Sequence, residues 1–375
     1  MNYDFLNQRL NALAEESRLR TIPQGNMNGI DLCSNDYMGL ASRFGEFMPE
    51  FTERFADAQM TSSASRLLSG NQKYHRQLEH HLDSVYGKSN ILFNSGYHAN
   101  VGTIQAMAAA GAVFVCDKLV HASVIDGLRC GNVRFLRFRH NDSEDAARQL
   151  KKIDNGEIPV IVTESIFSMD GDEAPLEELV EVKKSHPQCM LYLDEAHAIG
   201  VRGPKGAGLA AEKDLIHEVD ILIGTFGKAV ASSGAFVCSD KSVTDWLVNN
   251  ARSLIFSTAL PPANAAWTLL MIEKLTSMDA ERENLKRLSE RLRSVVSELS
   301  GEENPSTTQI IPLITHDSEK AIKISSELRN RGICALPIRR PTVPPGGERI
   351  RFSLNASLTL DDIDKVSNEL RKIFN

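Results

Sequence analysis

Two apolar runs in the middle of the chain each end in a side chain that can do chemistry. Lys228 closes the run Ile221-Leu-Ile-Gly-Thr-Phe-Gly-Lys228, and Asp194 closes Leu191-Tyr-Leu-Asp194, with His197 shortly after it. The amine of a lysine can form an imine with an aldehyde, and a carboxylate can hold the proton of a pyridinium ring. Those two tasks are the protein's share of pyridoxal phosphate chemistry, in which the cofactor accepts the electrons. The residues therefore predict an enzyme that uses pyridoxal phosphate.

The elements that must position these groups are short apolar runs that alternate with helical patterns. Segments such as 142–152 and 175–185 have the periodicity of helices. Continuous apolar runs separated by helices are typical of a mostly parallel sheet that helices cover on both faces. We therefore predict an α/β fold of this kind. Its strands are expected at 90–93, 112–116, 133–136, 160–163, 190–193, 220–223 and 235–238.

The pattern changes after Pro261-Pro262. Residues 263–299 predict one or two long helices, and the tail beyond them alternates short strands with helices. This change predicts a smaller C-terminal α+β domain. The expected segments are 1–45 (an N-terminal helix and strand), 46–265 (a large cofactor-binding α/β domain) and 266–375 (the C-terminal domain).

Chemically useful groups follow several of the predicted strands. In parallel α/β sheets, ligands bind at the carboxyl ends of the strands. Asp194, Thr225 and Lys228 lie at such ends, and Ser95-Gly-Tyr97 follows the strand at 90–93 just before a helix. Free N–H groups at the start of a helix bind phosphate. We therefore expect these strand ends to converge on one site.

The composition argues against several other classes of protein. A net charge of −7 is unlike that of a nucleic-acid-binding protein, which presents a basic face. The 6 cysteines contain no C-x-x-C pair, as expected for reduced thiols in the cytoplasm. The N-terminal stretch has no long apolar run, so neither a signal peptide nor a membrane span is expected. The 10 histidines form no two-His-plus-carboxylate pattern, and no metal is expected.

The letters of Asp194-Glu-Ala-His197 also match a helicase box. A nucleotide hydrolase needs a glycine-rich phosphate loop that ends in Gly-Lys-Ser or Gly-Lys-Thr. Here Gly227-Lys228 is followed by Ala229, and nothing else in the chain supplies that loop. The helicase interpretation is therefore rejected.

The positions of two histidines and two arginines in the sequence indicate whether they can belong to the site. His197 lies where the strand at 190–193 gives way to a loop, so its ring can reach the phenolic oxygen of a bound pyridoxal. A histidine at the position of His121 is more often a helix-start or core residue. Arg349 and Arg351 alternate on a predicted strand and so share a face. That pattern is typical of a solvated strand edge, although either fork of donors could bind a carboxylate.

These features belong to a set of motifs that runs nearly end to end through the chain. Together the motifs resemble the α-oxoamine synthase family, whose members condense an amino acid with an acyl-CoA thioester and release carbon dioxide. The resemblance implies the aminotransferase-like α/β fold of fold-type I enzymes, pyridoxal phosphate as cofactor, and a homodimer with a shared active site. The motifs are Ser34-Asn-Asp-Tyr-Met-Gly-Leu40, Ser65-Arg-Leu-Leu-Ser-Gly-Asn71, Asn94-Ser-Gly-Tyr-His-Ala-Asn100, Glu164-Ser-Ile-Phe-Ser-Met-Asp-Gly-Asp172, Asp194-Glu-Ala-His197, Thr225-Phe-Gly-Lys228 and Phe256-Ser-Thr-Ala-Leu-Pro-Pro262.

The resemblance gives the reacting groups their roles. Lys228 would carry the cofactor as an imine and then move protons at the substrate's α-carbon. Asp194 would keep the pyridine nitrogen protonated, so that the ring accepts electrons. His121 would stack on the ring face, and His197 and Ser168 would touch the phenolic oxygen.

The resemblance also implies how phosphate and substrates are bound. Arg351 would bind the carboxylate of the amino acid. The acyl site would be lined by Asn35, Arg20 and Arg339. The phosphate would be held by the amides of Gly96 and Tyr97, by Thr225, and by Ser257 or Thr258 of a second subunit.

The run Ile338-Arg-Arg-Pro-Thr-Val-Pro344 resembles one branch of the family, which joins L-alanine to a pimeloyl thioester of CoA or of a carrier protein. That branch usually has Arg-Pro-Pro, whereas this chain has Arg339-Arg340-Pro341. Three other substrate pairs stay open, namely glycine with acetyl-CoA, serine with a long acyl thioester, and a short amino acid with a medium acyl chain. A non-catalytic subunit on the same fold is a further alternative, but the joint presence of Lys228, Asp194 and His197 argues against it.

Overall fold

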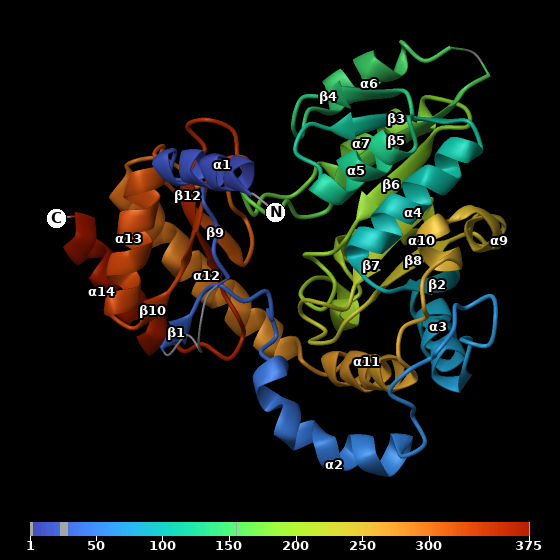
Figure 1. The fold of residues 1–375 in the computed structure, drawn as a ribbon, viewed down its shortest axis with the longest axis horizontal. Coiled ribbons are helices and arrows are strands. Elements are labelled where there is room, and N and C mark those ends of the chain that lie inside the picture. The colour runs from blue at the N-terminus through green and yellow to red at the C-terminus, as the bar shows by residue number, and fades with distance from the viewer. Residues whose placement is uncertain (1–2, 23–28, 155, 375) are drawn as a thin grey trace. The chain divides into compact units, whose positions relative to one another are not determined.

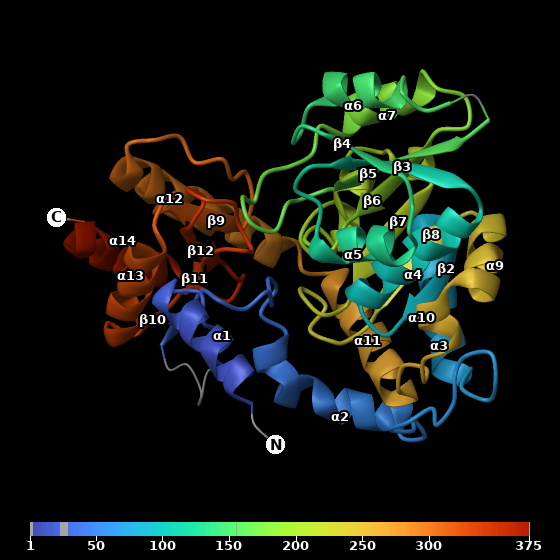
Figure 2. The ribbon, with the colours of Figure 1, turned by 45° about the horizontal axis from the view of Figure 1, so that its top comes forward.

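The computed structural model describes residues 3–22, 29–154 and 156–374. The chain divides into two compact units (Figures 1 and 2). The large unit consists of Asp36–Ser168 and Glu173–Arg282. The small unit consists of Met1–Asn35, Met169–Asp172 and Glu283–Asn375. This division into two units does not test the three segments expected from the sequence, 1–45, 46–265 and 266–375, which stay a prediction.

The large unit is built on a seven-stranded sheet with the order β2-β8-β7-β6-β5-β3-β4. Strand β8 is antiparallel to its neighbours β2 and β7, whereas all other neighbours pair in parallel. All strands except β8 therefore run in one direction, and their carboxyl ends lie at one edge of the sheet. The predicted mostly parallel α/β fold is confirmed. The strands are β2 (Ser89–Phe93), β3 (Ala112–Asp117), β4 (Phe135–Phe138), β5 (Ile158–Glu164), β6 (Met190–Asp194), β7 (Ile221–Thr225) and β8 (Ala235–Ser239).

The sheet is apolar on both faces, which explains why its strands read as continuous apolar runs. Phe114 and Val160 lie on one face in the main hydrophobic core, together with residues of α4 (Gly96–Ala109) and α5 (Ala122–Cys130). Their neighbours Val115 and Ile161 are fully buried as well, on the opposite face. Burial on both faces is the usual state of parallel sheets in α/β proteins.

Of the remaining helices of the large unit, α6, α7 and α8 alternate with the strands as predicted, whereas α2 and α3 precede β2, and α9, α10 and α11 follow β8 (Figure 1). Within the described parts of the chain, no helix is both long and apolar enough to span a membrane. The helices are α2 (Phe44–Phe55), α3 (Lys73–Tyr86), α6 (Ser143–Leu150), α7 (Leu176–Lys184), α8 (Leu209–Glu212), α9 (Lys241–Asn250), α10 (Arg252–Ile255) and α11 (Pro262–Leu275), with short 3-10 turns at Ala41–Arg43, Pro204–Gly206 and Ile216–Glu218.

The small unit combines segments from both ends of the chain. Its three-stranded antiparallel sheet has β12 in the centre, between β11 and β9. A separate parallel pair joins β1 to β10, with Ile30 opposite Ile333. The predicted C-terminal α+β arrangement is thus confirmed, and residues 263–299 form two helices, α11 and α12. The elements are α1 (Asp4–Glu15), β1 (Ile30–Asp31), α12 (Asp279–Ser300, which begins in the large unit), β9 (Ile310–Ile314), α13 (Ser318–Asn330), β10 (Ile333–Cys334), β11 (Leu336–Ile338), β12 (Arg349–Ser353) and α14 (Leu360–Phe374).

Candidate active site

The sheet brings the predicted strand-end residues of the large unit to one edge. Asp194 ends β6 and is the register partner of Glu164, which ends β5. Thr225 ends β7 and pairs with Ala235, the residue that also faces Phe93 at the end of β2. The loops after β2, β6 and β7 therefore start side by side. This is the edge at which α/β proteins bind ligands.

A hydrogen-bonded chain links the lysine, a histidine and a tyrosine. Lys228 Nζ lies 2.8 Å from His197 Nε2, and His197 Nδ1 lies 2.7 Å from the hydroxyl of Tyr37. Tyr37 is fully buried and His197 is only 5% exposed. Imidazole has one nitrogen on each side, so it can pass a proton between partners at its two ends. The geometry therefore gives Lys228 a buried proton-exchange partner.

A second buried network fixes the aspartate. Asn100, on α4, donates from Nδ2 to Asp194 Oδ2 at 2.8 Å and to the Ser123 hydroxyl at 2.9 Å. The hydroxyl of Tyr192 donates to Asn100 Oδ1, which sets the orientation of the amide. The backbone N–H of Ala196 donates to Asp194 Oδ1 at 2.9 Å. Each carboxylate oxygen has two lone pairs, so Asp194 retains acceptor capacity for a further donor.

His121 is joined to this network through Ser123. His121 is the N-cap residue of α5, and its Nδ1 lies 2.7 Å from the Ser123 hydroxyl. His121 as a residue is exposed, but the protein around its imidazole removes part of the water from the ring, and this desolvation lowers the pKa of His121. The negative charge of Asp194 opposes that shift, and the positive charge of Lys228 supports it. The neutral ring that results is suited to stacking on another flat ring.

Glu164 adds a second carboxyl group beside Asp194. It is 3% exposed, and its Oε1 is a buried atom that has no hydrogen-bond partner among the described residues. Burial raises the pKa of Glu164 well above the ordinary value, and the neighbouring charge of Asp194 raises it further. The sheet register therefore places a carboxyl group with a raised pKa directly beside Asp194.

The start of α4 forms the other end of the site. Ser95 caps this helix by accepting a hydrogen bond from the His98 N–H at 3.2 Å, so Gly96 occupies the first helical position. A Cβ on Gly96 would lie 3.6 Å from Thr225 Oγ1, so the helix start and the end of β7 are in contact. Amide groups at a helix start attract anions. A phosphate would find N–H donors and a hydroxyl together here.

The other predicted phosphate residues lie close to this helix start in the same chain. Asn94 donates from Nδ2 to the Ser257 hydroxyl and to the Thr258 carbonyl, each at 2.8 Å. The hydroxyl of Tyr97 donates to Asp126 at 2.7 Å, so this side chain points along the surface and leaves its backbone N–H at the helix start. The contribution of Ser257 or Thr258 to a second subunit stays a prediction.

The predicted substrate-binding residues lie in the small unit. Arg351 is buried, and both of its terminal nitrogens donate to Asn35 Oδ1, at 3.2 and 3.1 Å. Arg20 donates to the Thr342 hydroxyl at 2.7 Å, and Arg339 donates to the carbonyl of Ser17 at 2.5 Å. The small unit therefore brings Arg351 to Asn35, and it joins the loop between β11 and β12, which contains Arg339 and Thr342, to the segment 17–20.

One interpretation of the arginines is wrong. The alternation of Arg349 and Arg351 suggested a solvated strand edge, but β12 is the central strand of its sheet and both arginines are buried. A single strand's periodicity does not reveal whether strands flank it on both sides. Arg340, by contrast, is half exposed and pairs with buried Glu348 at 3.1 Å.

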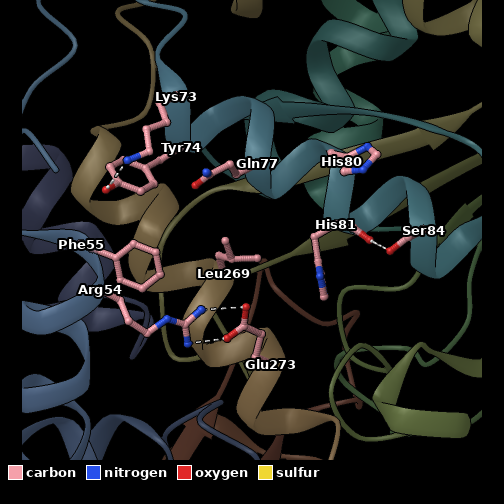
Figure 3. A pocket seen from close by; sticks show the side chains of 10 residues that line it. All are labelled: Arg54, Phe55, Lys73, Tyr74, Gln77, His80, His81, Ser84, Leu269 and Glu273. Atoms are coloured by element: carbon pink, nitrogen blue, oxygen red, sulfur yellow. Dashed lines mark hydrogen bonds and ion pairs between the residues drawn. The ribbon is translucent and has the colours of Figure 1, made fainter. Parts of the chain in front are cut away.

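A separate hollow lies between α2, α3 and α11 of the large unit (Figure 3). Its charged groups bind one another. Arg54 pairs with Glu273 at 2.7 Å, and Lys73 lies 3.2 Å from Asp57. Because these charges are already neutralised, the hollow has no convergent set of groups comparable to the strand-end site.

The chain belongs to the aminotransferase class I and II family, because the sequence profile of that family matches residues 27–370. Two curated relatives carry the name "Putative 8-amino-7-oxononanoate synthase". The protein of Pasteurella multocida is 44% identical over 375 residues, which covers 96% of this chain and 97% of the relative. That of Neisseria meningitidis serogroup A is 43% identical over 371 residues, covering 95% and 97%. These relatives confirm the resemblance to α-oxoamine synthases that the motifs indicated.

Solved structures confirm the fold. A serine palmitoyltransferase from S. paucimobilis with a bound PLP–myriocin aldimine superposes with a TM-score of 0.88 at 29% identity, covering 99% of this chain and 96% of the other. The 8-amino-7-oxononanoate synthase of Francisella tularensis has a TM-score of 0.75 at 24% identity, covering 92% of this chain and 99% of the other. At that identity the second likeness concerns the fold alone.

Sequence reasoning assigned no role to several residues that the structure places in the site. Tyr37, Asn100 and Glu164 each lie inside one of the family motifs, and Tyr192 lies two residues before Asp194. For Tyr37, Asn100 and Glu164, the available signal was their presence in the motifs. Their functions could not be read from it, because each depends on a partner from a distant part of the chain.

Proposed function

We propose that this protein is a pyridoxal-phosphate-dependent acyltransferase. In the proposed reaction, L-alanine condenses with a pimeloyl thioester to give 8-amino-7-oxononanoate, carbon dioxide and a free thiol, a step of biotin biosynthesis. The observation that carries the proposal is the 2.8 Å contact between Lys228 Nζ and His197 Nε2, at the same sheet edge as Asp194. An amine, a proton-exchange partner and a fixed anion form the set of groups that the cofactor requires.

The residues fit pyridoxal phosphate along its whole length. The start of α4 and Thr225 offer donors for the phosphate, and Asp194 offers acceptor oxygens for the pyridine N–H. When bound, the cofactor supplies an aldehyde that reacts with amines and a ring that accepts electrons from the substrate's α-carbon. Lys228 is the amine on this edge that would react with the aldehyde.

In this proposal, the chain's own residues handle the protons. Lys228 takes the proton from the α-carbon of alanine and later returns one, with His197 as its hydrogen-bond partner. Asp194, held by Asn100, keeps a proton at the pyridine nitrogen by its charge. The neutral ring of His121 stacks on the cofactor without adding a positive charge. Arg351 offers a fork of donors to the alanine carboxylate.

The proposed form is a homodimer in the cytoplasm. Met60, Leu68 and Phe256 on the large unit are 80%, 79% and 71% exposed. Backbone hydrogen bonds join the segments 59–64 and 259–263, so Met60 lies near the segment that carries Ser257 and Thr258. A contiguous patch of exposed apolar side chains marks an interaction surface, and we propose that a second copy of the chain seated on these side chains reaches the phosphate residues. The cytoplasmic location is supported by the cysteine pattern of the sequence, whose 6 cysteines contain no C-x-x-C pair.

Support for alanine and a pimeloyl thioester comes from the names of the curated relatives and from the loop between β11 and β12. The test measures thiol release with L-alanine and pimeloyl-CoA or pimeloyl-carrier protein, and identifies the product by mass spectrometry. Formation of 8-amino-7-oxononanoate is the expected result. No turnover with either thioester, together with turnover of another pair, would refute the choice of substrate but not the reaction class.

A second candidate is a serine palmitoyltransferase-like activity, which the structural likeness at a TM-score of 0.88 favours. Serine with a long acyl thioester would then be the active pair. Glycine with acetyl-CoA, the pair of 2-amino-3-ketobutyrate ligase, completes the panel. Turnover of one of these pairs alone would identify the alternative.

The absorbance of the bound cofactor distinguishes all these enzymes from a binding protein without catalytic activity. The purified enzyme should be yellow, and borohydride should remove the long-wavelength absorbance by reducing the bond to Lys228. A preparation that stays colourless after addition of pyridoxal phosphate would refute the proposal that this protein is a pyridoxal-phosphate-dependent enzyme.

A further inference from the structure

A ribbon of the chain, residues 165–174, starts at the backbone of the candidate site, and its two arms, 165–168 and 173–174, belong to the large unit. The Ser165 N–H donates to the carbonyl of Asp194 at 2.9 Å. Ile166 and Glu173 then form an antiparallel bridge, so the two arms of the ribbon run side by side. The base of the ribbon is thereby attached to the residue that is proposed to hold the pyridine nitrogen.

The tip of the ribbon, Met169–Asp172, belongs to the small unit. The Gly171 carbonyl accepts hydrogen bonds from the Thr307 N–H at 3.1 Å and from the Thr308 hydroxyl at 2.8 Å. Gly171 has φ +71°, and a Cβ at this position would lie 2.0 Å from the Ile310 carbonyl oxygen. The tip is therefore packed directly on the start of β9, at a distance that only glycine permits.

Arg349 is the side chain that holds this tip. It is 5% exposed, and it donates from Nη1 to the Met169 carbonyl at 3.1 Å and to Asp170 Oδ1 at 2.5 Å. Its Nε donates to the Gly347 carbonyl at 2.7 Å. Removing one partner of a buried, hydrogen-bonded ion pair leaves an uncompensated charge. The fork of Arg349 thus fixes the tip at two successive residues, and none of the roles proposed above uses it.

Ser168 is covalently bonded to Met169, and consecutive Cα atoms are about 3.8 Å apart. Any displacement of the tip therefore moves Ser168. Arg349 also shares a face of β12 with Arg351, the proposed carboxylate ligand. One rigid strand thus carries both the anchor for the amino acid and the anchor for the ribbon.

We propose that Arg349 is a positioning residue, which acts through the ribbon 165–174 on Ser168 and Asp194. The inference rests on the proposed function, because it assigns Ser168 to the phenolic oxygen of the cofactor and Asp194 to the ring nitrogen. Arg349 itself touches neither the cofactor nor the substrate in this scheme. Its effect is to hold the tip of the ribbon at Met169 and Asp170, and thereby to restrain Ser168, which is bonded to Met169.

The test is a double-mutant cycle on the full-length protein loaded with pyridoxal phosphate. Arg349→Met, Ser168→Ala and the double variant are compared for kcat, for the KM of the amino acid, and for the pH at which the cofactor absorbance changes. Arg349→Met and Ser168→Ala should each lower kcat about tenfold and shift this pH in the same direction, and the double variant should resemble either single one. Effects that multiply, or a spectrum unchanged by Arg349→Met, would overturn the inference.

Two further variants separate positioning from general loss of stability. Asp170→Asn removes the negative charge that pairs with Arg349, and Asp170 is partly exposed. This variant therefore tests the same contact if Arg349→Met does not fold. It should shift the spectrum in the same direction as Arg349→Met. The matched control is Arg331→Met, which breaks an ion pair of the small unit with Glu369. That variant should leave the spectrum and kcat unchanged, and a shift of equal size would overturn the inference.

The same experiment distinguishes failure of the inference from failure of the proposed function. A wild-type protein that stays colourless with pyridoxal phosphate refutes both. A yellow, active wild type whose Arg349→Met and Asp170→Asn variants have unchanged spectra refutes the positioning role alone.

Discussion

Replacing Tyr37 by phenylalanine tests the proton chain at the centre of the proposal. The Tyr37 hydroxyl lies 2.7 Å from His197 Nδ1, and Lys228 Nζ lies 2.8 Å from His197 Nε2. If the lysine is an ammonium, it donates to Nε2, and Nδ1–H then donates to the tyrosine oxygen. If the lysine is a neutral amine, Nε2–H donates to it, and the tyrosine O–H donates to Nδ1. A hydroxyl serves both states because it donates and accepts, whereas a phenyl ring serves neither.

The expected magnitude follows from burial. Tyr37 is 0% exposed and His197 5%, so bulk water does not replace the lost hydroxyl. Removing one partner of a buried polar group costs about 1–3 kcal/mol. If that cost falls on the proton-transfer step, kcat decreases about 5- to 150-fold, because about 1.4 kcal/mol corresponds to a factor of ten.

The assay is steady-state thiol release by the holoenzyme, with urea unfolding of the same variants in parallel. Tyr86→Phe is the matched control, because Tyr86 is a buried tyrosine whose hydroxyl donates to the Ala207 carbonyl at 3.1 Å. Both variants should lose stability, and only Tyr37→Phe should lose kcat at saturating substrates. Equal kcat values for the two variants, with similar losses of stability, would refute the proton chain.

Three further outcomes are expected. Lys228→Ala should abolish turnover while leaving the protein folded by circular dichroism, and wild-type activity in this variant would contradict the assigned role. Arg351→Lys should raise the KM for the amino acid about 10- to 150-fold, from the loss of about 1.5–3 kcal/mol of charge-assisted hydrogen bonding, whereas Arg331→Lys on the surface should leave this KM unchanged. The pKa of Glu164 is raised in the folded protein, so protonation favours folding and this stability is lost as the pH rises above the ordinary value of 4.5. The free energy of unfolding of Glu164→Gln, relative to that of wild type, should therefore increase as the pH rises, by at most about 1.4 kcal/mol per pH unit. A relative free energy, measured by urea unfolding, that does not vary between pH 5 and 8 would contradict a raised pKa of Glu164.

The sheet could be predicted because its strands leave a strong local signal. The runs 160–162 and 221–223 are apolar without a break, and each appears in the structure as part of a buried strand, β5 or β7. The convergence of Asp194 and Lys228 then follows from a general property of parallel sheets. Local pattern and global rule agree in this part of the chain.

Other features of the site depend on contacts that no local pattern encodes. Tyr37 meets His197 across 160 positions of the chain, and Asn100 meets Asp194 across 94. The burial of Arg349 depends on β12 having a strand on each side, which its own alternation of residues cannot reveal. Such contacts are set by the topology of the fold. The sequence shows the polar residues that make them, but it does not show which residues are their partners.

The small unit draws its strands from both ends of the chain, and this affects how the protein is made. Strand β1 at Ile30 pairs with β10 at Ile333, so the first strand has to wait until about 300 more residues have left the ribosome. At about 5–20 residues per second, that delay is about 15–60 s. The sheet of the large unit is complete in sequence at Ser239, well before then. During synthesis the large unit can therefore fold first, while the N-terminal segment, with Phe5, Leu6 and Leu10 exposed to solvent, stays without its strand partner.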